Sequence, residues 1–223
     1  MKAFGVIDNV HQKHAVVPES VCNEFKKLSG DQMNGYRDVA EGIANNDIVT
    51  HSRTALQHMT RVLMQNFDLV WFKRDLRVRD HVPLLSAALS GRPVICLFIL
   101  EPEKFDIEDT DPIHIHWELD CAIRLSENLK KTGADLHFKI GNAIEVFEKI
   151  NDNYKIERIL SHEETGNYWS YNRDKKILKW CELNNISWIE YPNNGVVRRL
   201  GDRDGWKKER DARMRSPLSD PPI

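Results

Sequence analysis

Short, continuous apolar runs that alternate with helical patterns constrain the fold of this chain more than any other feature. The clearest run covers residues 93–100 and reads PVICLFIL, with no charged or amide side chain in it. A strand that is apolar on both faces is typical of a parallel sheet covered by helices on both sides. Parallel strands also need a crossover connection, which is usually a helix. The chain from residue 67 onward is therefore expected to form an α/β domain.

The alternation predicts strands at 68–73, 93–100, 135–140, 156–161 and 187–191, with helices at 82–89, 113–131, 143–150 and 168–184. Asp80 is the expected N-cap of the first helix, with Pro83 in its first turn. In the last helix Ile177, Leu178 and Cys181 are expected to face inward. Right-handed crossovers then predict a Rossmann-like, doubly wound parallel sheet with strand order 3-2-1-4-5.

Composition and charge exclude several classes of protein. A net charge of -2 does not suit a protein that coats nucleic acid. No apolar run approaches the ~20 residues of a membrane span, so no membrane association is expected. The first residues lack the pattern of a cleavable signal. The four cysteines form no CxxC pair and are expected to be reduced, which suits a cytoplasmic protein.

The two ends of the chain lack the alternating pattern. Residues 1–66 show two short helical patterns, at 19–28 and 54–64, and are predicted to be a partly helical or disordered extension. Residues 193–223 carry eight basic residues against four acids between positions 195 and 215. This basic tail is interpreted as an interdomain connector, with contact to a DNA backbone as the alternative. The α/β domain itself is expected to cover residues 67–192.

Ligands of open parallel sheets bind beyond the carboxyl ends of the strands, where the strand order reverses. Here that point lies between the first and fourth strands, so its rims are residues 73–76 and 161–165. Lys73 and Arg74 either form a charged rim for a ligand or belong to a structural turn in which Asp75 bridges to an arginine. Glu163 and Glu164 either contact a ligand or cap the next helix.

Several chemical motifs are absent from the sequence. Neither GxGxxG nor GxxxxGK[ST] occurs, so no phosphate-binding glycine loop is predicted. His114 and His116 stand near Cys121, but residues two apart on a helix point to different sides. A metal site is therefore not predicted there, and no residue is assigned a catalytic role.

Three separated blocks resemble the DNA photolyase and cryptochrome family. They are residues 69–81 (LVWFKRDLRVRDH), residues 161–174 (SHEETGNYWSYNRD), and residues 194–200 (NGVVRRL) with RDGW at 203–206 and Met214. Together they look like the branch of deoxyribodipyrimidine photolyase-related proteins. The resemblance covers residues 67 to about 217 and does not extend to residues 1–66.

The resemblance implies an N-terminal α/β domain that holds a light-harvesting antenna, which is a folate, a deazaflavin or a flavin. In the family, a larger helical domain binds FAD and damaged DNA, and reduced FAD splits cyclobutane pyrimidine dimers. This chain ends at Ile223, where the connector to that domain should continue. We therefore expect FAD and DNA to bind only through a helical domain that is missing or separate, and no repair by this chain alone.

The resemblance also implies which residues meet the antenna. They follow the first, second and fourth strands or begin the second helix, and they are Lys73, Arg74, Leu100, Glu101, His114, His116, Glu163 and Glu164. Two alternatives remain open at this point. The first is a stand-alone nucleotide-binding or interaction module of the same fold, since fold does not fix function. The second is a remnant without activity.

Overall fold

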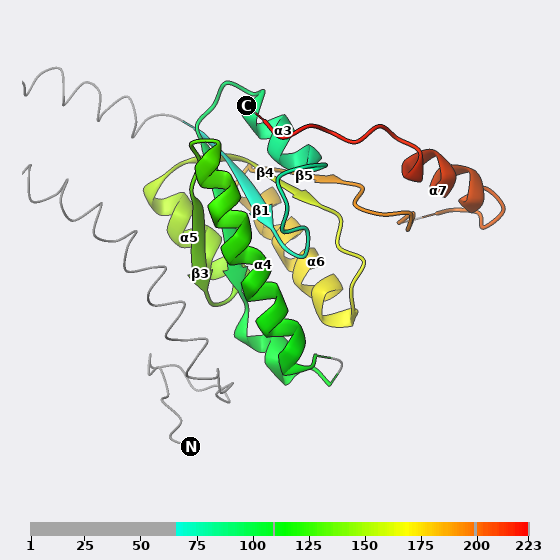
Figure 1. Ribbon diagram of the computed structural model, residues 1–223. Helices are drawn as coiled ribbons and strands as arrows, with labels where there is room; N and C mark the ends of the chain where they lie inside the picture. The colour runs from blue at the N-terminus through cyan, green and yellow to red at the C-terminus, as the bar shows by residue number, and fades with distance from the viewer. Residues whose placement is uncertain (1–65, 109, 199, 223) are drawn as a thin grey trace, which may run out of the picture.

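A five-stranded parallel sheet forms the centre of the molecule (Figure 1). The computed structural model describes residues 66–108, 110–198 and 200–222. The strands are β1 (Phe67–Phe72), β2 (Val94–Leu100), β3 (Leu136–Ile140), β4 (Ile156–His162) and β5 (Ser187–Tyr191). Their order is β3-β2-β1-β4-β5, and every neighbouring pair is parallel. The predicted fold class and strand order are confirmed.

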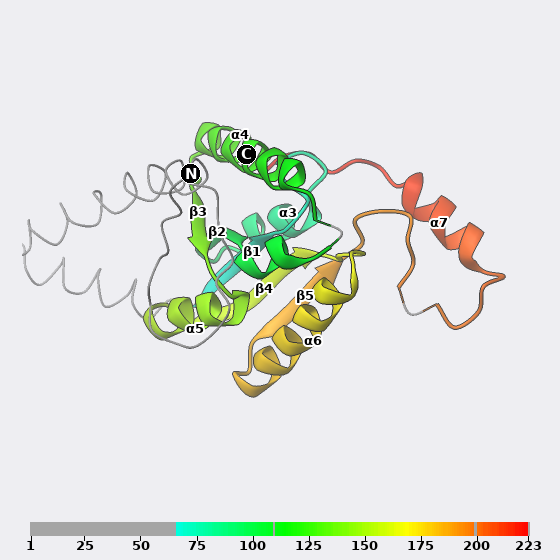
Figure 2. The ribbon, with the colours of Figure 1, turned by 90° about the horizontal axis from the view of Figure 1, so that it is seen from below.

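Helices connect the strands and cover both faces of the sheet. They are α3 (Val82–Ala88), the short 3-10 helix η1 (Pro102–Asp106), α4 (Pro112–Lys131), α5 (Ala143–Asn153) and α6 (Tyr168–Leu183), and α7 (Trp206–Met214) follows the sheet. Figure 2 shows α3 and α4 on one face and α5 and α6 on the other. The connection from β3 to β4 therefore changes face, which places the switch point between β1 and β4.

Side chains set the starts of the three longest helices that pack on the sheet. The carboxylate of Asp111 accepts a hydrogen bond from the amide of Ile113 at the start of α4. Asn142 and Asn167 do the same for α5 and α6 through their side-chain oxygens. Each cap satisfies an amide that the helix itself leaves without a partner. These caps place the first turns of α4, α5 and α6 at the carboxyl edge of the sheet.

Two hydrophobic clusters lie on the two faces of the sheet. Alternate residues of β1 point to the two clusters. Val70 and Phe72 belong to the cluster under α3 and α4. Leu69 and Trp71 belong to the cluster under α5 and α6. All four side chains are at most 1% exposed. The unbroken apolar strands of the sequence thus serve two cores at once.

Two local predictions are wrong. His81, not Asp80, caps α3, since its Nδ1 accepts from the amide of Leu84; Asp80 has a φ of 54°. Leu178 is 40% exposed because it lies about 100° around the helix from Ile177. The tail contains one helix, α7, for which the sequence analysis made no prediction.

The proposed helices at 19–28 and 54–64 lie outside the described residues. Within the described residues, no helix has both the length and the apolarity needed to cross a membrane.

Candidate functional site

A cavity of about 730 Å³ lies beyond the carboxyl ends of β1 and β4, and we call it the switch-point cavity. The loop after β1 lines it with Arg74, Leu76 and Arg77. The first turns of α4 line it with residues from His114 to Cys121. Lys104, Thr110 and residues 165–167 before α6 complete it. The cavity therefore occupies the place where open parallel sheets bind their ligands.

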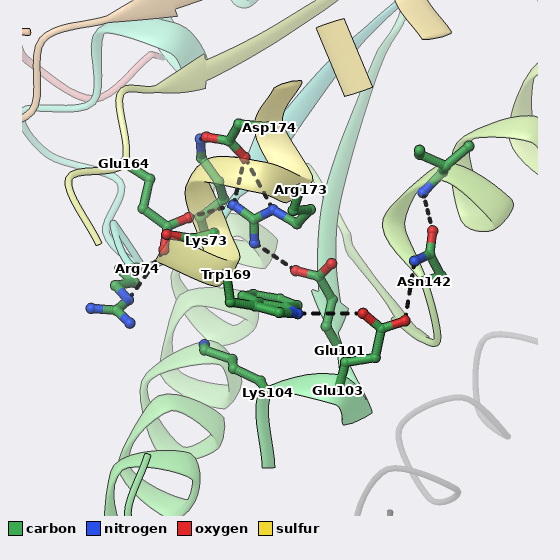
Figure 3. A network of polar contacts seen from close by, with 12 residues as sticks. Lys73, Arg74, Glu101, Glu103, Lys104, Asn142, Glu164, Trp169, Arg173 and Asp174 are labelled. Atoms are coloured by element: carbon green, nitrogen blue, oxygen red, sulfur yellow. Dashed lines mark hydrogen bonds and ion pairs between the residues drawn. The ribbon is translucent and has the colours of Figure 1, made fainter. Parts of the chain in front are cut away.

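A buried ion-pair network stands next to this cavity, centred on Arg173 of α6 (Figure 3). The guanidinium Nη1 donates to Glu101 Oε2 at 2.6 Å, and Nη2 donates to Glu164 Oε2 at 2.5 Å. Nε and Nη2 also donate to Asp174 Oδ1, at 3.0 and 2.8 Å. One arginine thus holds together the end of β2, the loop after β4 and the start of α6. We call these four residues the Arg173 cluster.

The network sets the protonation of its carboxyl groups. Burial raises the pKa of Glu101 to about 7, although Arg173 opposes that shift. Burial also disfavours the ionised form of Glu164, but Arg173 and Lys73 outweigh it and hold the pKa of Glu164 below its usual value. Burial opposes the charge on Arg173, yet its three carboxylate partners raise the pKa of the guanidinium. The cluster therefore keeps one carboxyl group that can take up a proton near neutral pH.

Lys73 lies behind the same cluster and is buried. Its Nζ is 3.8 Å from Asp174 Oδ2 and 3.8 Å from Glu190 Oε1, and it stands 4.9 Å from the ring centroid of Trp71. The ammonium has ion-pair and cation–π partners but no hydrogen-bond partner among the described residues. Lys73 therefore serves the structure of the turn after β1 and does not line the cavity.

A second buried cluster anchors the same turn. Asp75 Oδ2 lies 2.6 Å from His162 Nδ1 and 2.8 Å from His81 Nε2. Although burial disfavours its ionised form, these two histidines hold the pKa of Asp75 far below its usual value. The prediction that Asp75 bridges to an arginine is wrong, because two histidines fill that role.

The geometry of this second cluster resembles a metal-binding triad. However, His81 Nδ1 accepts the amide hydrogen of Leu84 at 3.1 Å. A neutral imidazole with an unprotonated Nδ1 carries its proton on Nε2, which is the atom that faces Asp75. A metal ion at Nε2 would have to displace that proton. The arrangement therefore fits a buried polar link, in which Asp75 contacts His162 and His81, better than a metal centre.

A comparison with protein families gives a match to the DNA photolyase model over residues 68–203. This match covers more than half of the chain. The chain belongs to the DNA photolyase family. Over 101 residues it is 32% identical to cryptochrome DASH from Gloeobacter violaceus, which covers 43% of this chain and 20% of that protein.

Solved structures of the family share the fold. A cryptochrome from Synechocystis matches with a TM-score of 0.59 and 21% identity, over 70% of this chain and 36% of that one. An archaeal photolyase from Sulfolobus tokodaii matches with a TM-score of 0.56 and 24% identity, over 70% of this chain and 36% of that one. The chain thus spans about a fifth of the curated relative and about a third of the two solved proteins.

The structure brings some of the predicted antenna residues of this photolyase-family chain together and separates others. Arg74 and His114 line the switch-point cavity, and Glu101 and Glu164 stand beside it in the Arg173 cluster. Their contact with a ligand stays a prediction.

The other four predicted residues lie away from the cavity lining. Lys73 and Leu100 are buried, and exposed His116 contacts the carbonyl of Pro112 through Nδ1. Glu163 pairs with Arg213 at 3.4 Å. Neither Glu163 nor Glu164 caps α6, because Asn167 does so. The helix-cap interpretation of the two glutamates is therefore wrong.

Sequence reasoning assigned no role to Arg173, which is the centre of the network. The spacing of residues along α6 contained a signal for Arg173. Ser170, Arg173 and Ile177 are three and four residues apart, so they share one face of α6, and all three are buried. A charged residue on the buried face of a helix requires buried partners of opposite charge. The family block at 161–174 contains Arg173 and Asp174 without indicating what they contact.

Proposed function

We propose that this chain is the antenna domain of a photolyase or cryptochrome, and that the switch-point cavity binds a light-harvesting chromophore. The observation that carries the proposal is the cavity, which combines a volume of about 730 Å³ with an aromatic wall and a cationic wall. Small-molecule sites typically measure roughly 300–1,000 Å³. A folate, a deazaflavin or a flavin fits this class of site, because each joins a planar ring system to a polar chain.

The relatives support the proposal in general terms. The archaeal photolyase that shares the fold is described as holding two FAD molecules and as implying a novel light-harvesting cofactor. A bound chromophore would supply absorption of near-ultraviolet or blue light. The residues of this chain would hold it in place: Ile115 and Trp117 of α4 offer apolar contact, and Arg74 offers a guanidinium. The Arg173 cluster would keep the walls of the cavity fixed.

The partner of such a domain would be a helical FAD-binding domain, in this polypeptide or in a separate chain. Light energy would pass from the antenna to FAD there, and damaged DNA with cyclobutane pyrimidine dimers would be the substrate of the complete protein. A cytoplasmic setting is consistent with this role. We expect no dimer repair from residues 1–223 without that domain.

Titration of the purified chain with each chromophore class tests the proposal. The ligands are 5,10-methenyltetrahydrofolate, a deazaflavin, and a flavin such as FMN, with ATP as the test of a general nucleotide module. Absorbance and fluorescence of each chromophore report binding. We expect saturable binding of at least one chromophore and no competition by ATP. Tight binding of ATP without binding of any chromophore would overturn the antenna function.

A cavity-filling variant locates the ligand. Cys121→Phe places a ring in the cavity lining, because Cys121 lines it from α4. We expect at least a tenfold weaker affinity, which corresponds to about 1.4 kcal/mol. The matched control is Arg124→Phe, at an exposed position of the same helix that does not line the cavity. Equal affinity of both variants and the wild type would place the chromophore elsewhere.

A further inference from the structure

The tail that follows β5 leaves the body of the protein and returns to it at one loop. Helix α7 lies in the middle of this tail, and in Figure 1 the end of the tail returns to α3. Before α7, Asn193 Oδ1 accepts a hydrogen bond from Arg77 Nη2 at 2.9 Å. After α7, the carbonyl of Ser219 accepts one from the amide of Asp80 at 2.8 Å. The loop between β1 and α3 therefore holds the tail on both sides of α7.

Asp80 connects the tail to Arg77 through its backbone and its carboxylate. Its φ of 54° lies in the left-handed region, which aspartate tolerates better than most residues. Its carbonyl accepts from Arg77 Nε at 3.1 Å, and its Oδ1 accepts from the amide of Ser219 at 3.4 Å. A backbone conformation of this kind persists where the contacts around it support it. The tail is therefore part of what holds the loop in place.

The loop has an inner side, which is fixed without the tail, and an outer side, which is not. Asp75 and His81 form the inner side, where they are buried and contact each other at 2.8 Å. Residues 77–80 form the outer side and are half-buried or exposed. Within the described part of the chain, the hydrogen bonds of residues 77–80 to anything beyond this loop all go to the tail. Because Arg77 lines the switch-point cavity, the tail also supports that part of the cavity wall.

Residues 217–222 (PLSDPP) have the properties of an extended ligand. Proline fixes its own φ near −65°, and the residue before a proline favours an extended conformation. Leu218 and Asp220 are exposed, whereas Ser219 and Pro221 are half-buried. This alternation is expected when an extended chain lies with one side on a surface. The three prolines leave the segment few conformations to lose, which lowers the entropic cost of docking.

We propose that residues 77–80 form a docking site for an extended, proline-containing segment, and that residues 217–222 occupy it as a detachable strap. The strap keeps Arg77 in the wall of the switch-point cavity. The site binds the backbone of the segment, because the carbonyl and the amide of Ser219 make its hydrogen bonds. An extended segment of a separate peptide offers the same backbone groups. Docking of the strap does not depend on which ligand the cavity takes.

Hydrogen exchange of the Asp80 amide in the full chain reports docking, because this amide donates to the carbonyl of Ser219. The test variant replaces the three prolines of the strap with glycine (Pro217→Gly, Pro221→Gly and Pro222→Gly). Glycine gives the undocked segment more conformational freedom, so we expect the Asp80 amide to exchange about ten times faster. The matched control is Leu218→Ala, at a side chain that is 61% exposed, and it should keep the wild-type rate. Equal Asp80 rates in the glycine variant and the wild type would overturn the strap.

The side chain of Arg77 tests whether the strap positions the cavity wall. Its Nε donates to the carbonyl of Asp80, so nuclear magnetic resonance can follow the exchange of this N–H with water. In the glycine variant we expect this exchange to become faster by a factor similar to that of the Asp80 amide. The amide of Leu89, which donates to the carbonyl of Leu85 within the same helical segment, is the internal reference and should not change. A faster Asp80 amide with an unchanged Arg77 Nε–H would overturn the positioning of Arg77.

A separate peptide tests whether the loop is a docking site in its own right. The peptide SPLSDPP, residues 216–222, is added to the glycine variant at about 5 mM, which is comparable with the effective concentration of a tethered segment. We expect it to bring the exchange of the Asp80 amide back to within about a factor of three of the wild type. The same peptide with glycine at the three proline positions is the matched control and should restore nothing. Failure of the proline-containing peptide to restore protection would overturn the docking site.

Discussion

Glu101 is a buried carboxyl group whose charge state depends on its surroundings. It is 5% exposed and its pKa is raised by burial from its usual 4.5 to about 7. Between these values the folded state binds the proton and the unfolded state has lost it. The contribution of Glu101 to the free energy of unfolding is therefore fully present below pH 4.5, and it is lost as the pH rises toward 7.

Glu101→Gln should remove this pH dependence, because glutamine has the shape of the protonated acid and cannot ionise. Relative to the variant, the wild type should lose up to about 3 kcal/mol of unfolding free energy between pH 5 and pH 8. Urea unfolding at several pH values measures the difference. Glu103→Gln, at an exposed carboxylate two residues along, is the control and should follow the wild type. Parallel pH profiles for wild type and Glu101→Gln would contradict the prediction.

At the residue scale, the sequence predicted charged groups around the switch point but not their pairing. Lys73, Glu101 and Glu164 were singled out because they follow strands. Arg173, the partner of the two glutamates, comes from α6, and Lys73 pairs with Asp174 of α6 and Glu190 of β5. Asp75 pairs with His81 and His162 from two other elements. Such pairings depend on how α6 and α3 pack on the sheet, and a single sequence does not contain that information.

At the element scale, the strands and the helices between them were predicted closely. Strand β5 was predicted with its observed bounds, and β2 differs by one residue at its start. Burial on both faces makes β2 apolar throughout, which is a strong local signal. Helix α7 has no such signal, since six of its nine residues are charged and none is buried.

Helix α7 should therefore be the least stable helix of the described chain. Its contacts with the rest of the molecule include Arg213 Nη1, which donates to the carbonyl of Val196 at 2.7 Å. Gly195 also lies close to it, because a Cβ added there would stand 2.9 Å from Arg210 Cγ. Figure 1 shows it standing apart from the sheet.

Local opening of an unpacked helix costs little free energy, whereas opening of packed elements approaches the global cost. We expect amides of α7 to exchange with deuterium within about a factor of 100 of the free-peptide rate. Amides of α6, with six buried residues, should exchange far more slowly and serve as the internal control. Equal protection of α6 and α7 would show that α7 has a packing partner.

At the scale of the whole molecule, one sheet joins two hydrophobic clusters that do not otherwise meet. Phe98 of β2 is fully buried in the cluster under α3 and α4. Its neighbour Leu97 is fully buried in the other cluster, together with Trp71 and Trp180. Because β1, β2 and β4 supply buried side chains to both clusters, loss of one core should remove the support of the other, and the two should unfold together.

Phe98→Ala tests this coupling, since the buried tryptophans report from the opposite face. The variant should lose roughly 3–5 kcal/mol of stability, as expected for a large cavity in a core. The midpoint of urea unfolding should fall equally by tryptophan fluorescence and by far-ultraviolet circular dichroism. Leu97→Ala, on the tryptophan side, is the matched control and should also move both signals together. A fluorescence midpoint that stays at its wild-type value in Phe98→Ala would mean that the two faces unfold independently.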